Sequence, residues 1–269
     1  MLRTRVITAV VLVAAFLGAL FFANSLWWSM LALAAILVAA HEWCRLWAFE
    51  SAQEFGYLLA ITGSGALILF LLPPHAASAP LFVAAALFWF VAAPIWLRGG
   101  WSPVPKWLAA LVGALIFLPI WLAMVELRDL GRVWLLSVMA LVWVADIAAY
   151  FAGKAFGRHK LAPVISPGKT WEGVAGAGAG VLLYATLAIL AWHATAADRP
   201  DVDLYSWSMW MVLALILCGI SVVGDLFESA VKRQAGVKDS GTLLPGHGGV
   251  LDRVDALLPV LPLAALSLL

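Results

Sequence analysis

The chain has 269 residues, of which 65% are hydrophobic and only 12% charged, and its mean hydropathy is +1.01. This composition excludes a water-soluble domain and indicates a chain that lies largely within a membrane. The formal net charge of +1 gives no indication of a partner, and no pattern along the chain indicates binding to nucleic acid.

Long apolar runs follow one another from end to end, and each is close to the ~20 residues with which a helix crosses a ~30 Å hydrocarbon core. The first run lacks a clear cleavage site, so we expect it to be retained and not removed as a signal peptide. We predict an all-α, polytopic integral membrane helix bundle of about nine transmembrane helices, covering residues 6–23, 26–42, 55–73, 79–97, 107–125, 133–153, 174–193, 208–224 and 255–269.

The positive charges orient this bundle. If the N-terminus is cytoplasmic and nine spans alternate, all of the sixteen Lys and Arg except Arg128, Arg132 and Arg199 fall on the cytoplasmic side. Such a bias is typical of membrane proteins and predicts a cytoplasmic N-terminus. Most tryptophans, Trp28 and Trp43 among them, fall near span ends, where interfacial anchoring is the expectation.

Polar residues return in the sixth predicted span. Asp146, Tyr150 and Gly153 are spaced so that they share one helical face. An aspartate within a span is expected to face the bundle interior and to have a partner, and a purely structural pairing remains an alternative to a functional site. The two cysteines, Cys44 and Cys218, form neither a disulfide framework nor a metal motif and are expected to be packing residues.

The basic loop after that span contains Gly168-Lys169-Thr170, which looks like the end of a P-loop. A P-loop needs a glycine where this chain has Pro163, and a soluble helix after it, so we reject that interpretation. Lys169 remains a candidate for holding a phosphate as a loop lysine.

Two glutamates lie at span ends. Glu172 begins the seventh span, where helix capping and a catalytic role are both open. Glu42 lies at the inner end of the second span, where it is expected to pair with Arg45, and no sequence feature supports a functional role for it.

Residues 225–255 concentrate nine charged side chains, one histidine and five glycines. If the eighth span continues as a helix, one polar stripe runs along it, formed by Asp225, Glu228, Ser229 and Lys232. Further along, Asp252 and Asp255 lie three residues apart at the start of the ninth span, where helix capping is an alternative for Asp255.

A glycine-rich turn separates these two acidic clusters. Gly246, Gly248 and Gly249 allow backbone amides to approach an oxyanion closely. His247 stands between glycines and is a candidate for a phosphate hydrogen bond or for proton transfer. Two carboxylates from neighbouring helices can hold Mg²⁺, which binds one or two carboxylates together with substrate phosphates and water. The segment therefore predicts a site for phosphates and a metal ion.

The order of these residues resembles the C-terminal motif of the bacterial phosphatidate cytidylyltransferases, also called CDP-diacylglycerol synthases. The motif reads Ser229-x-x-Lys232-Arg233-x4-Lys238-Asp239-x5-Pro245-Gly246-His247-Gly248-Gly249-x-x-Asp252-Arg253-x-Asp255. The segments around Asp146 and from Ser166 to Gly173 are also similar to that family. The resemblance is specific over residues 146–255 and only architectural over residues 1–145.

The resemblance implies a Mg²⁺-dependent reaction of CTP with phosphatidate that gives CDP-diacylglycerol and pyrophosphate for phospholipid biosynthesis. A second cation and a homodimer are left open. The implied metal ligands are Asp225 and Asp252, followed by Asp146 and Asp255. The implied catalytic set is Asp225, Lys232, Lys238, Asp239, His247, Asp252 and Arg253, and the phosphate-binding set is Lys169, Ser229, Arg233, Gly246, Gly248 and Gly249.

One integral membrane domain, residues 1–269, accommodates this assignment. A five-span scaffold with a lipid-facing part, 1–145, precedes a catalytic part, 146–269, whose cytoplasmic loops are 154–173 and 225–254. A bacterial inner membrane with the active site facing the cytoplasm fits this plan. Two other functions stay open: a CTP-dependent lipid-alcohol kinase, which would transfer the γ-phosphoryl group, and a membrane transporter, against which the clustering of charges at one face argues.

Overall fold

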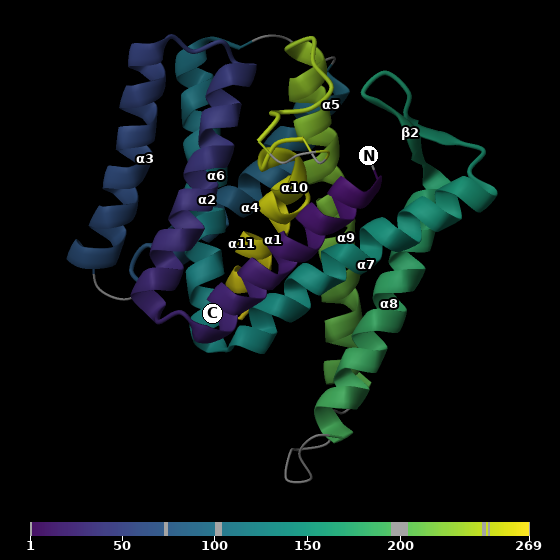
Figure 1. The fold of residues 1–269 in the computed structure, drawn as a ribbon. Helices are drawn as coiled ribbons and strands as arrows, with labels where there is room; N and C mark the ends of the chain where they lie inside the picture. Colours follow the sequence, from purple (N-terminus) through teal and green to yellow (C-terminus); the bar gives the residue numbers. More distant parts are fainter. Residues whose placement is uncertain are drawn as a thin grey trace.

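The computed structural model describes residues 2–72, 75–99, 104–194, 204–243, 246 and 248–268, of which 2–7, 193 and 204 are described by their backbone alone. The described chain is almost entirely helical (Figure 1), as predicted. The helices are α1 (Leu2–Phe22), α2 (Ser25–Leu46), α3 (Ser51–Leu71), α4 (Ser78–Leu87), the π-helical turn η1 (Phe88–Ala92), α5 (Ala93–Arg98), α6 (Lys106–Leu130), α7 (Arg132–Phe156), α8 (Trp171–Ala194), α9 (Leu204–Gln234), α10 (Leu251–Val254) and α11 (Leu257–Leu266).

Seven helical segments in the described part are long and apolar enough to cross a membrane. They are Ser25–Leu46, Ser51–Leu71, Ser78–Arg98, Lys106–Leu130, Arg132–Phe156, Trp171–Trp192 and Tyr205–Gln234. The first and last predicted spans form shorter apolar helices, Thr8–Phe22 and Leu257–Leu266. The chain is therefore an all-α polytopic membrane protein, whereas the number of nine spans and the side of the N-terminus stay predictions.

The third of these segments changes its helical geometry at a proline. Pro94 has no N–H, so it cannot donate to the carbonyl one turn before it. Just before it, the Ala93 N–H reaches back five residues to the Phe88 carbonyl, which is the π-helical pattern of η1. Because of this local adjustment, α4, η1 and α5 continue as one span of 21 residues.

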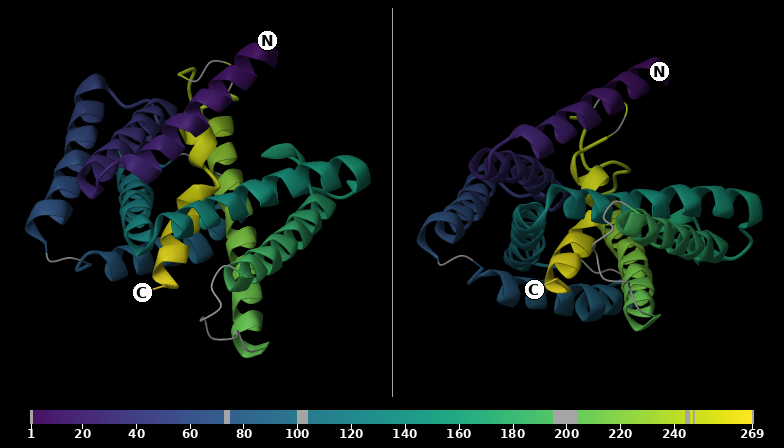
Figure 2. Two further views of the ribbon diagram at one scale, coloured as in Figure 1. Left: turned by 60° about the horizontal axis from the view of Figure 1, so that its bottom comes forward. Right: turned by 90° about the horizontal axis from the view of Figure 1, so that it is seen from below.

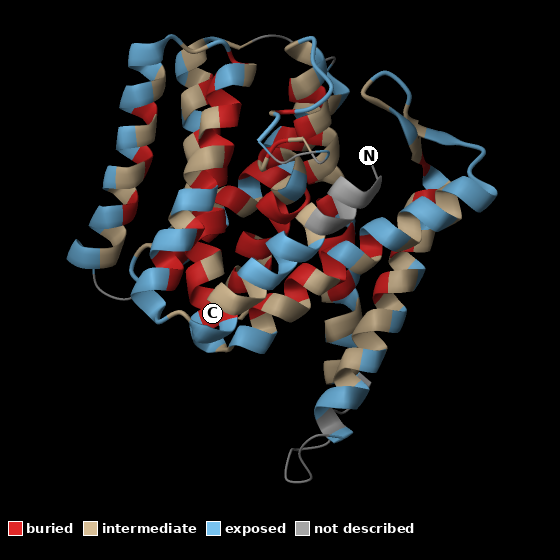
Figure 3. Cartoon of the chain, in the orientation of Figure 1, coloured by how far each residue is buried: buried red, intermediate tan, exposed pale blue. Residues whose placement is uncertain are grey.

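The core lies around α6, the most enclosed of the spans (Figure 3). Its Phe117 and Trp121 are fully buried. The two cysteines, Cys44 and Cys218, are buried and free, as predicted.

Two tryptophans of α2 join this core. The expectation of interfacial anchoring is wrong for Trp28 and Trp43, which are each only 2% exposed. Their indole N–H groups donate across to α6, to the carbonyls of Met124 and Ala109, both at 3.0 Å. A buried indole needs such an acceptor, and these bonds fix α2 against α6.

Helices α7 and α8 pack closely because two glycines of α8 present no side chain. A Cβ on Gly180 would lie 2.6 Å from the Ala148 Cβ, and one on Gly176 would overlap the Ala152 Cβ. Small residues allow helix backbones to approach in membranes. Figure 2 shows this pair of helices extending away from the α1–α6 part of the bundle.

An antiparallel hairpin connects α7 to α8. It consists of β1 (Lys160–Ala162) and β2 (Ser166–Thr170), a pairing that no pattern in the sequence predicts. The hairpin and the segment that follows α9 both lie toward the upper part of the molecule in Figure 1.

Candidate active site

The hairpin and α9 bring the two polar regions of the sequence together. Lys169 on β2 reaches Asp225 on α9, with 2.5 Å between the Lys169 Nζ and the Asp225 Oδ2. Ser229, one turn further along α9, donates to the other carboxylate oxygen, Oδ1, at 3.3 Å. The structure thus joins three predicted site residues into one group. Ser229 binds the side chain of Asp225 and not the backbone of its own helix.

A second group, more deeply buried, surrounds Lys232. Its ammonium lies between Glu228 on the same helix and Asp252, whose Oδ1 is 2.6 Å away. The side chains of these three residues are 12%, 2% and 4% exposed, in the order Lys232, Glu228, Asp252. Two carboxyl groups thus share one ammonium in a buried place. Lys232 is therefore engaged by the protein itself, and Glu228 joins the predicted site residues.

Asp252 also orders the loop that precedes it. Its Oδ2 accepts hydrogen bonds from the backbone N–H of Ser240 at 2.9 Å and of Gly249 at 2.8 Å. Burial raises the pKa of the Asp252 carboxyl, but the bonds from Lys232, Gly249 and Ser240 outweigh it, so the pKa lies below its ordinary value. Asp252 is thus a charged anchor for both the Lys232 group and the loop.

The glycines of this loop are needed for two different reasons. Gly248 has a φ of +83°, and a Cβ there would lie 2.6 Å from the Asp252 Oδ2. Gly249 is buried, and a Cβ on it would collide with Ser240 and with Glu42. The Gly249 amide already donates to Asp252, so this amide stabilises the loop.

Gly246 and His247 complete the predicted turn. Gly246 is exposed and has a φ of +76°, which suits a glycine. His247 lies outside the described residues.

Glu42 is the neighbour of this site that sequence reasoning missed. It does not make the expected pair with Arg45: its carboxylate accepts from the Ser240 hydroxyl and from the amides of Val250 and Leu251. An acidic residue at the inner end of a span does signal a buried partner. These partners lie about 200 positions away in the sequence, so nothing local could have identified them.

Further carboxylates lie around Asp225. Both Asp146 and Asp255 are close enough for the charge of Asp225 to act on them. Asp255 accepts from the Ala256 amide at 2.8 Å, and Gly224 lets this part of the chain approach α9.

Asp146 differs from the expectation. It is exposed on α7 and makes no hydrogen bond or ion pair within the described chain, so the expected bonded partner is not found. The charges that act on it are those of Asp225, Lys169 and Arg253. Asp146 therefore belongs to the same electrostatic environment without being fixed by a contact.

Several predicted residues are exposed around these groups. Arg233 donates to the Ile165 carbonyl of the hairpin at 3.3 Å and to the Val237 carbonyl at 3.4 Å, so it ties the hairpin to the end of α9. Three more predicted site residues have exposed side chains, namely Lys238, Asp239 and Arg253.

Glu172 holds the start of the hairpin to α8. It accepts from His159, with 2.6 Å between the Glu172 Oε1 and the His159 Nδ1. The His159 backbone N–H also donates to this carboxylate, at 3.2 Å. These contacts give Glu172 a structural role at the hairpin.

The carboxylates of this end suit a divalent cation that arrives with a phosphate. Within the described residues, no three acidic, imidazole or thiol side chains are grouped so that they alone could hold a metal ion. Mg²⁺ does not need one, since it commonly binds one or two carboxylates and takes its other ligands from phosphates and water. One oxygen of buried Glu228, Oε1, has no hydrogen-bond partner in the described part, and the charges of Asp252 and Asp255 act on it. This donor set fits a magnesium ion.

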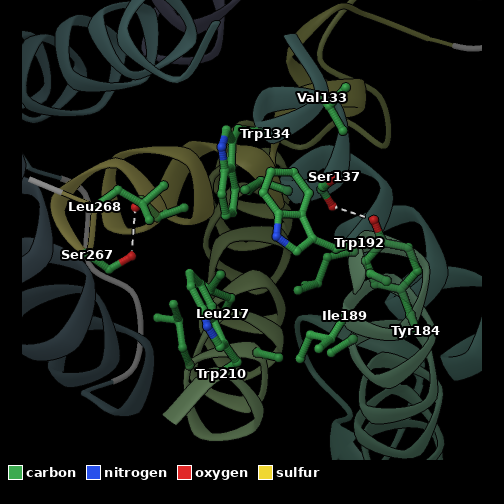
Figure 4. A pocket seen from close by; sticks show the side chains of 17 residues that line it. Val133, Trp134, Ser137, Tyr184, Ile189, Trp192, Trp210, Leu217, Ser267 and Leu268 are labelled. Carbon is green, nitrogen blue, oxygen red and sulfur yellow. Dashed lines mark hydrogen bonds between the residues drawn. The ribbon is translucent and has the colours of Figure 1, made fainter. Parts of the chain in front are cut away.

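A cavity of about 370 Å³ lies elsewhere, among α7, α8, α9 and α11 (Figure 4). Three tryptophans line it, with Trp134 5.8 Å from Trp192 and 5.9 Å from Trp210 between ring centroids. Its polar groups include the Tyr184 hydroxyl, which already donates to the Ser137 carbonyl at 3.0 Å. The described residues that line the cavity carry no charge, so they offer nothing to neutralise a triphosphate.

These features define a class: a polytopic helical membrane protein with a buried ion cluster and exposed cations at one end of its bundle. The chain belongs to the cytidylyltransferase family, whose model matches residues 3–269. The similarity thus extends through the N-terminal half.

Several named relatives are similar to this chain. A phosphatidate cytidylyltransferase of Pseudomonas aeruginosa is 40% identical over 277 aligned residues, covering 98% of this chain and 96% of the relative. One of Brucella melitensis is 38% identical and covers 95% and 89%. One of Thermotoga maritima is 41% identical over a shorter stretch, 61% of this chain and 60% of the relative.

Proposed function

We propose that this protein transfers the cytidylyl group of CTP to phosphatidate, forming CDP-diacylglycerol and pyrophosphate for phospholipid biosynthesis. The family match over nearly the whole chain and the relatives' names support this assignment. The observation that carries it in the structure is the joining of Lys169 to Asp225 and of Lys232 to Asp252 at one end of a membrane bundle. A lipid phosphate and a water-soluble nucleotide can both reach such a place.

The chemistry needs little more than positioning and charge neutralisation. A phosphate oxygen of phosphatidate attacks the α-phosphorus of CTP, one P–O bond forms, and the bond from the α-phosphorus to the bridging oxygen breaks as pyrophosphate leaves. The attacking oxygen is already anionic, so no strong general base is required. Preorganised cations and a held geometry supply the rate enhancement.

The cations divide this work according to their exposure. Lys169, Lys238 and Arg253 can meet the phosphates, and Lys169 is already aligned by Asp225. Lys232 is enclosed by two carboxylates, so we assign it to holding Asp252 in place.

The carboxylates divide between metal binding and structure. Those that would hold Mg²⁺ are Asp225, Asp252, Asp255 and Asp146, and the Glu228 Oε1 atom would be a further ligand. A bound Mg²⁺ would neutralise charge on the phosphates. Since Asp252 also anchors its own loop, its substitution should affect both the ion and the loop.

The membrane arrangement is part of the proposal. Nine spans with a cytoplasmic N-terminus put the charged end on the cytoplasmic side, where CTP is found, in a bacterial inner membrane. The proposal leaves a homodimer and a second cation as additional features to be measured.

Labelled nucleotide tests the reaction. Purified protein in detergent would receive Mg²⁺ and CTP labelled at either the α- or the γ-phosphate, with phosphatidate or diacylglycerol as acceptor. We expect only α-label to enter the lipid, only with phosphatidate, and with release of pyrophosphate. Entry of γ-label into diacylglycerol would instead establish a lipid kinase. Absence of both from folded protein would overturn the proposed transfer.

A further inference from the structure

Glu42 lies near the end of α2, in the part of the chain that carries none of the motif residues. It is buried, with only 2% of the residue exposed. The Oε1 atom accepts from the Val250 amide at 3.0 Å. The Oε2 atom accepts from the Leu251 amide at 2.8 Å and from the Ser240 hydroxyl at 2.9 Å. One carboxylate therefore holds both ends of the 240–251 loop.

The backbone amides at the end of this loop, where α10 begins, need a hydrogen-bond acceptor. The first amides of a helix have no partner within it, and a side chain at the N-cap usually supplies one. Val250 occupies that position before α10 and has no polar side chain to offer. Glu42, 208 positions away in the sequence, accepts instead from two of these first amides, those of Val250 itself and of Leu251. The fit is close, since a Cβ on Gly241 would lie 2.5 Å from the Glu42 Oε1.

The same loop residues hold Asp252. Ser240 uses its hydroxyl for Glu42 and its backbone amide for the Asp252 Oδ2. The Gly249 amide donates to that same oxygen, and the amides bound by Glu42 follow directly after it. Asp252 in turn binds Lys232. A continuous set of hydrogen bonds thus connects α2 with the ion cluster on α9.

We propose that Glu42 is a positioning residue for cytidylyl transfer, acting through the 240–251 loop on Asp252, an inference that rests on the proposed function. It gives the N-terminal scaffold a part in the active site, because α2 holds the loop while α9 supplies the charges. A small displacement of reacting groups can cost ~10²-fold in rate, so losing this tether should reduce turnover strongly.

Glu42→Gln tests the tether because both oxygens of Glu42 accept from backbone N–H groups. Whichever way the amide is turned, its NH₂ faces a donor. A matched control is Glu126→Gln at another buried glutamate, 7% exposed. There a single oxygen, Oε1, accepts from both His75 and Ser78, so an amide oxygen can keep both bonds.

We expect kcat of Glu42→Gln to fall at least ~10-fold with KM for CTP within ~3-fold, because the loss concerns the reacting geometry. Glu126→Gln should keep wild-type kcat. Ser240→Ala, which removes one bond only, should lose less. Combining it with Glu42→Gln should add little to the loss, since both act through one loop.

The possible results separate the two proposals. Wild-type kcat in Glu42→Gln, or losses in the double variant that multiply, would overturn the positioning role while leaving the transfer reaction standing. Failure of the wild-type protein to transfer α-label would instead overturn the proposed function. If Glu42→Gln does not fold, the role is decided by Ser240→Ala: a lower kcat at unchanged KM supports it, and an unchanged kcat overturns it.

Discussion

The two ends of the bundle formed by α2 and α6 use buried charges in different ways. At the end where α1 finishes, Arg128 is 6% exposed and donates to the carbonyls of Leu20 and Ala23. Close to it in the sequence, Glu126 accepts from His75 and from Ser78, the first residue of α4. Through these hydrogen bonds, both charged groups join one segment of the chain to another.

At the other end the charges are less completely satisfied. Glu228 keeps an oxygen without a hydrogen-bond partner among the described residues, and Lys238 and Arg253 are exposed. Fully satisfied charges stabilise a fold, whereas incompletely satisfied ones are available to a ligand.

The largest effect should follow from removing a cation at the charged end. Lys169→Met takes away the partner of Asp225, and the loss of one preorganised electrostatic contact commonly costs ~10²–10³ in rate. Lys160→Met, on the facing strand of the same hairpin, is the matched control and should retain activity. Initial rates of label transfer measure both. Equal losses in the two variants would show that the hairpin's fold, and not the Lys169 charge, is what matters.

A smaller effect is expected from crowding the loop. Gly248→Ala puts a Cβ 2.6 Å from the Asp252 Oδ2 at a φ of +83°, and should lower kcat about tenfold, which corresponds to ~1.4 kcal/mol. Gly236→Ala is the control that separates backbone strain from a steric collision. Gly236 has a similar φ of +72°, but a Cβ there would meet only open space. Comparable kcat values in the two variants would remove the collision with Asp252 from the explanation.

At the opposite end, loss of charge should change stability and not turnover. Arg128→Ala removes two hydrogen bonds to backbone carbonyls at the end of α1 and should lower the free energy of unfolding by roughly 2–4 kcal/mol. The exposed Arg132 provides the control, Arg132→Ala, with little change expected in either quantity. Thermal unfolding in detergent and the transfer rate of the folded fraction would be measured together. A fall in kcat for Arg128→Ala would break the distinction between the two ends.

The smallest effect concerns pH. The folded-state pKa of Asp252 lies below its ordinary value of 3.8, so its carboxylate contributes stability that is fully present above about pH 4. That contribution is lost as the pH falls through the folded-state pKa. Between pH 6 and pH 3, the melting temperature of the wild-type protein should therefore fall more than that of Asp252→Asn. Parallel falls would show that Asp252 gains nothing from its bonds in the folded state.

Sequence patterns predicted the parts of this molecule that depend on local spacing. Apolar run length located the helices, and the stripe from Asp225 to Lys232 follows from helical periodicity alone. The ion pairs that these side chains form could not be predicted, because spacing along a helix does not say which cation meets which carboxylate. Lys169 was expected to bind a phosphate and Lys232 to belong to the catalytic set, yet the structure engages Lys232 with two acids.

Contacts between distant segments were beyond that reasoning. Trp28 and Trp43 are amphipathic residues near span ends, where the same sequence position suits either the membrane interface or a buried acceptor on α6. The β1–β2 hairpin lies in a stretch that contains Pro163 and Pro167, and proline is unfavourable in strands. The sequence shows that Glu42 is an acidic residue in an apolar helix, but only the fold reveals which loop it binds.

A direct assay asks whether the charged end performs the transfer. It compares the initial rates of α-label transfer from CTP to phosphatidate in Asp225→Asn and Asp129→Asn, with folding of both verified by thermal unfolding. Asp225 binds Lys169 and Ser229, whereas Asp129 lies at the opposite end beside Ser25. We predict a loss of ~10²–10³ in the first variant and a wild-type rate in the second. A wild-type rate in Asp225→Asn, or equal losses in both, would contradict the account.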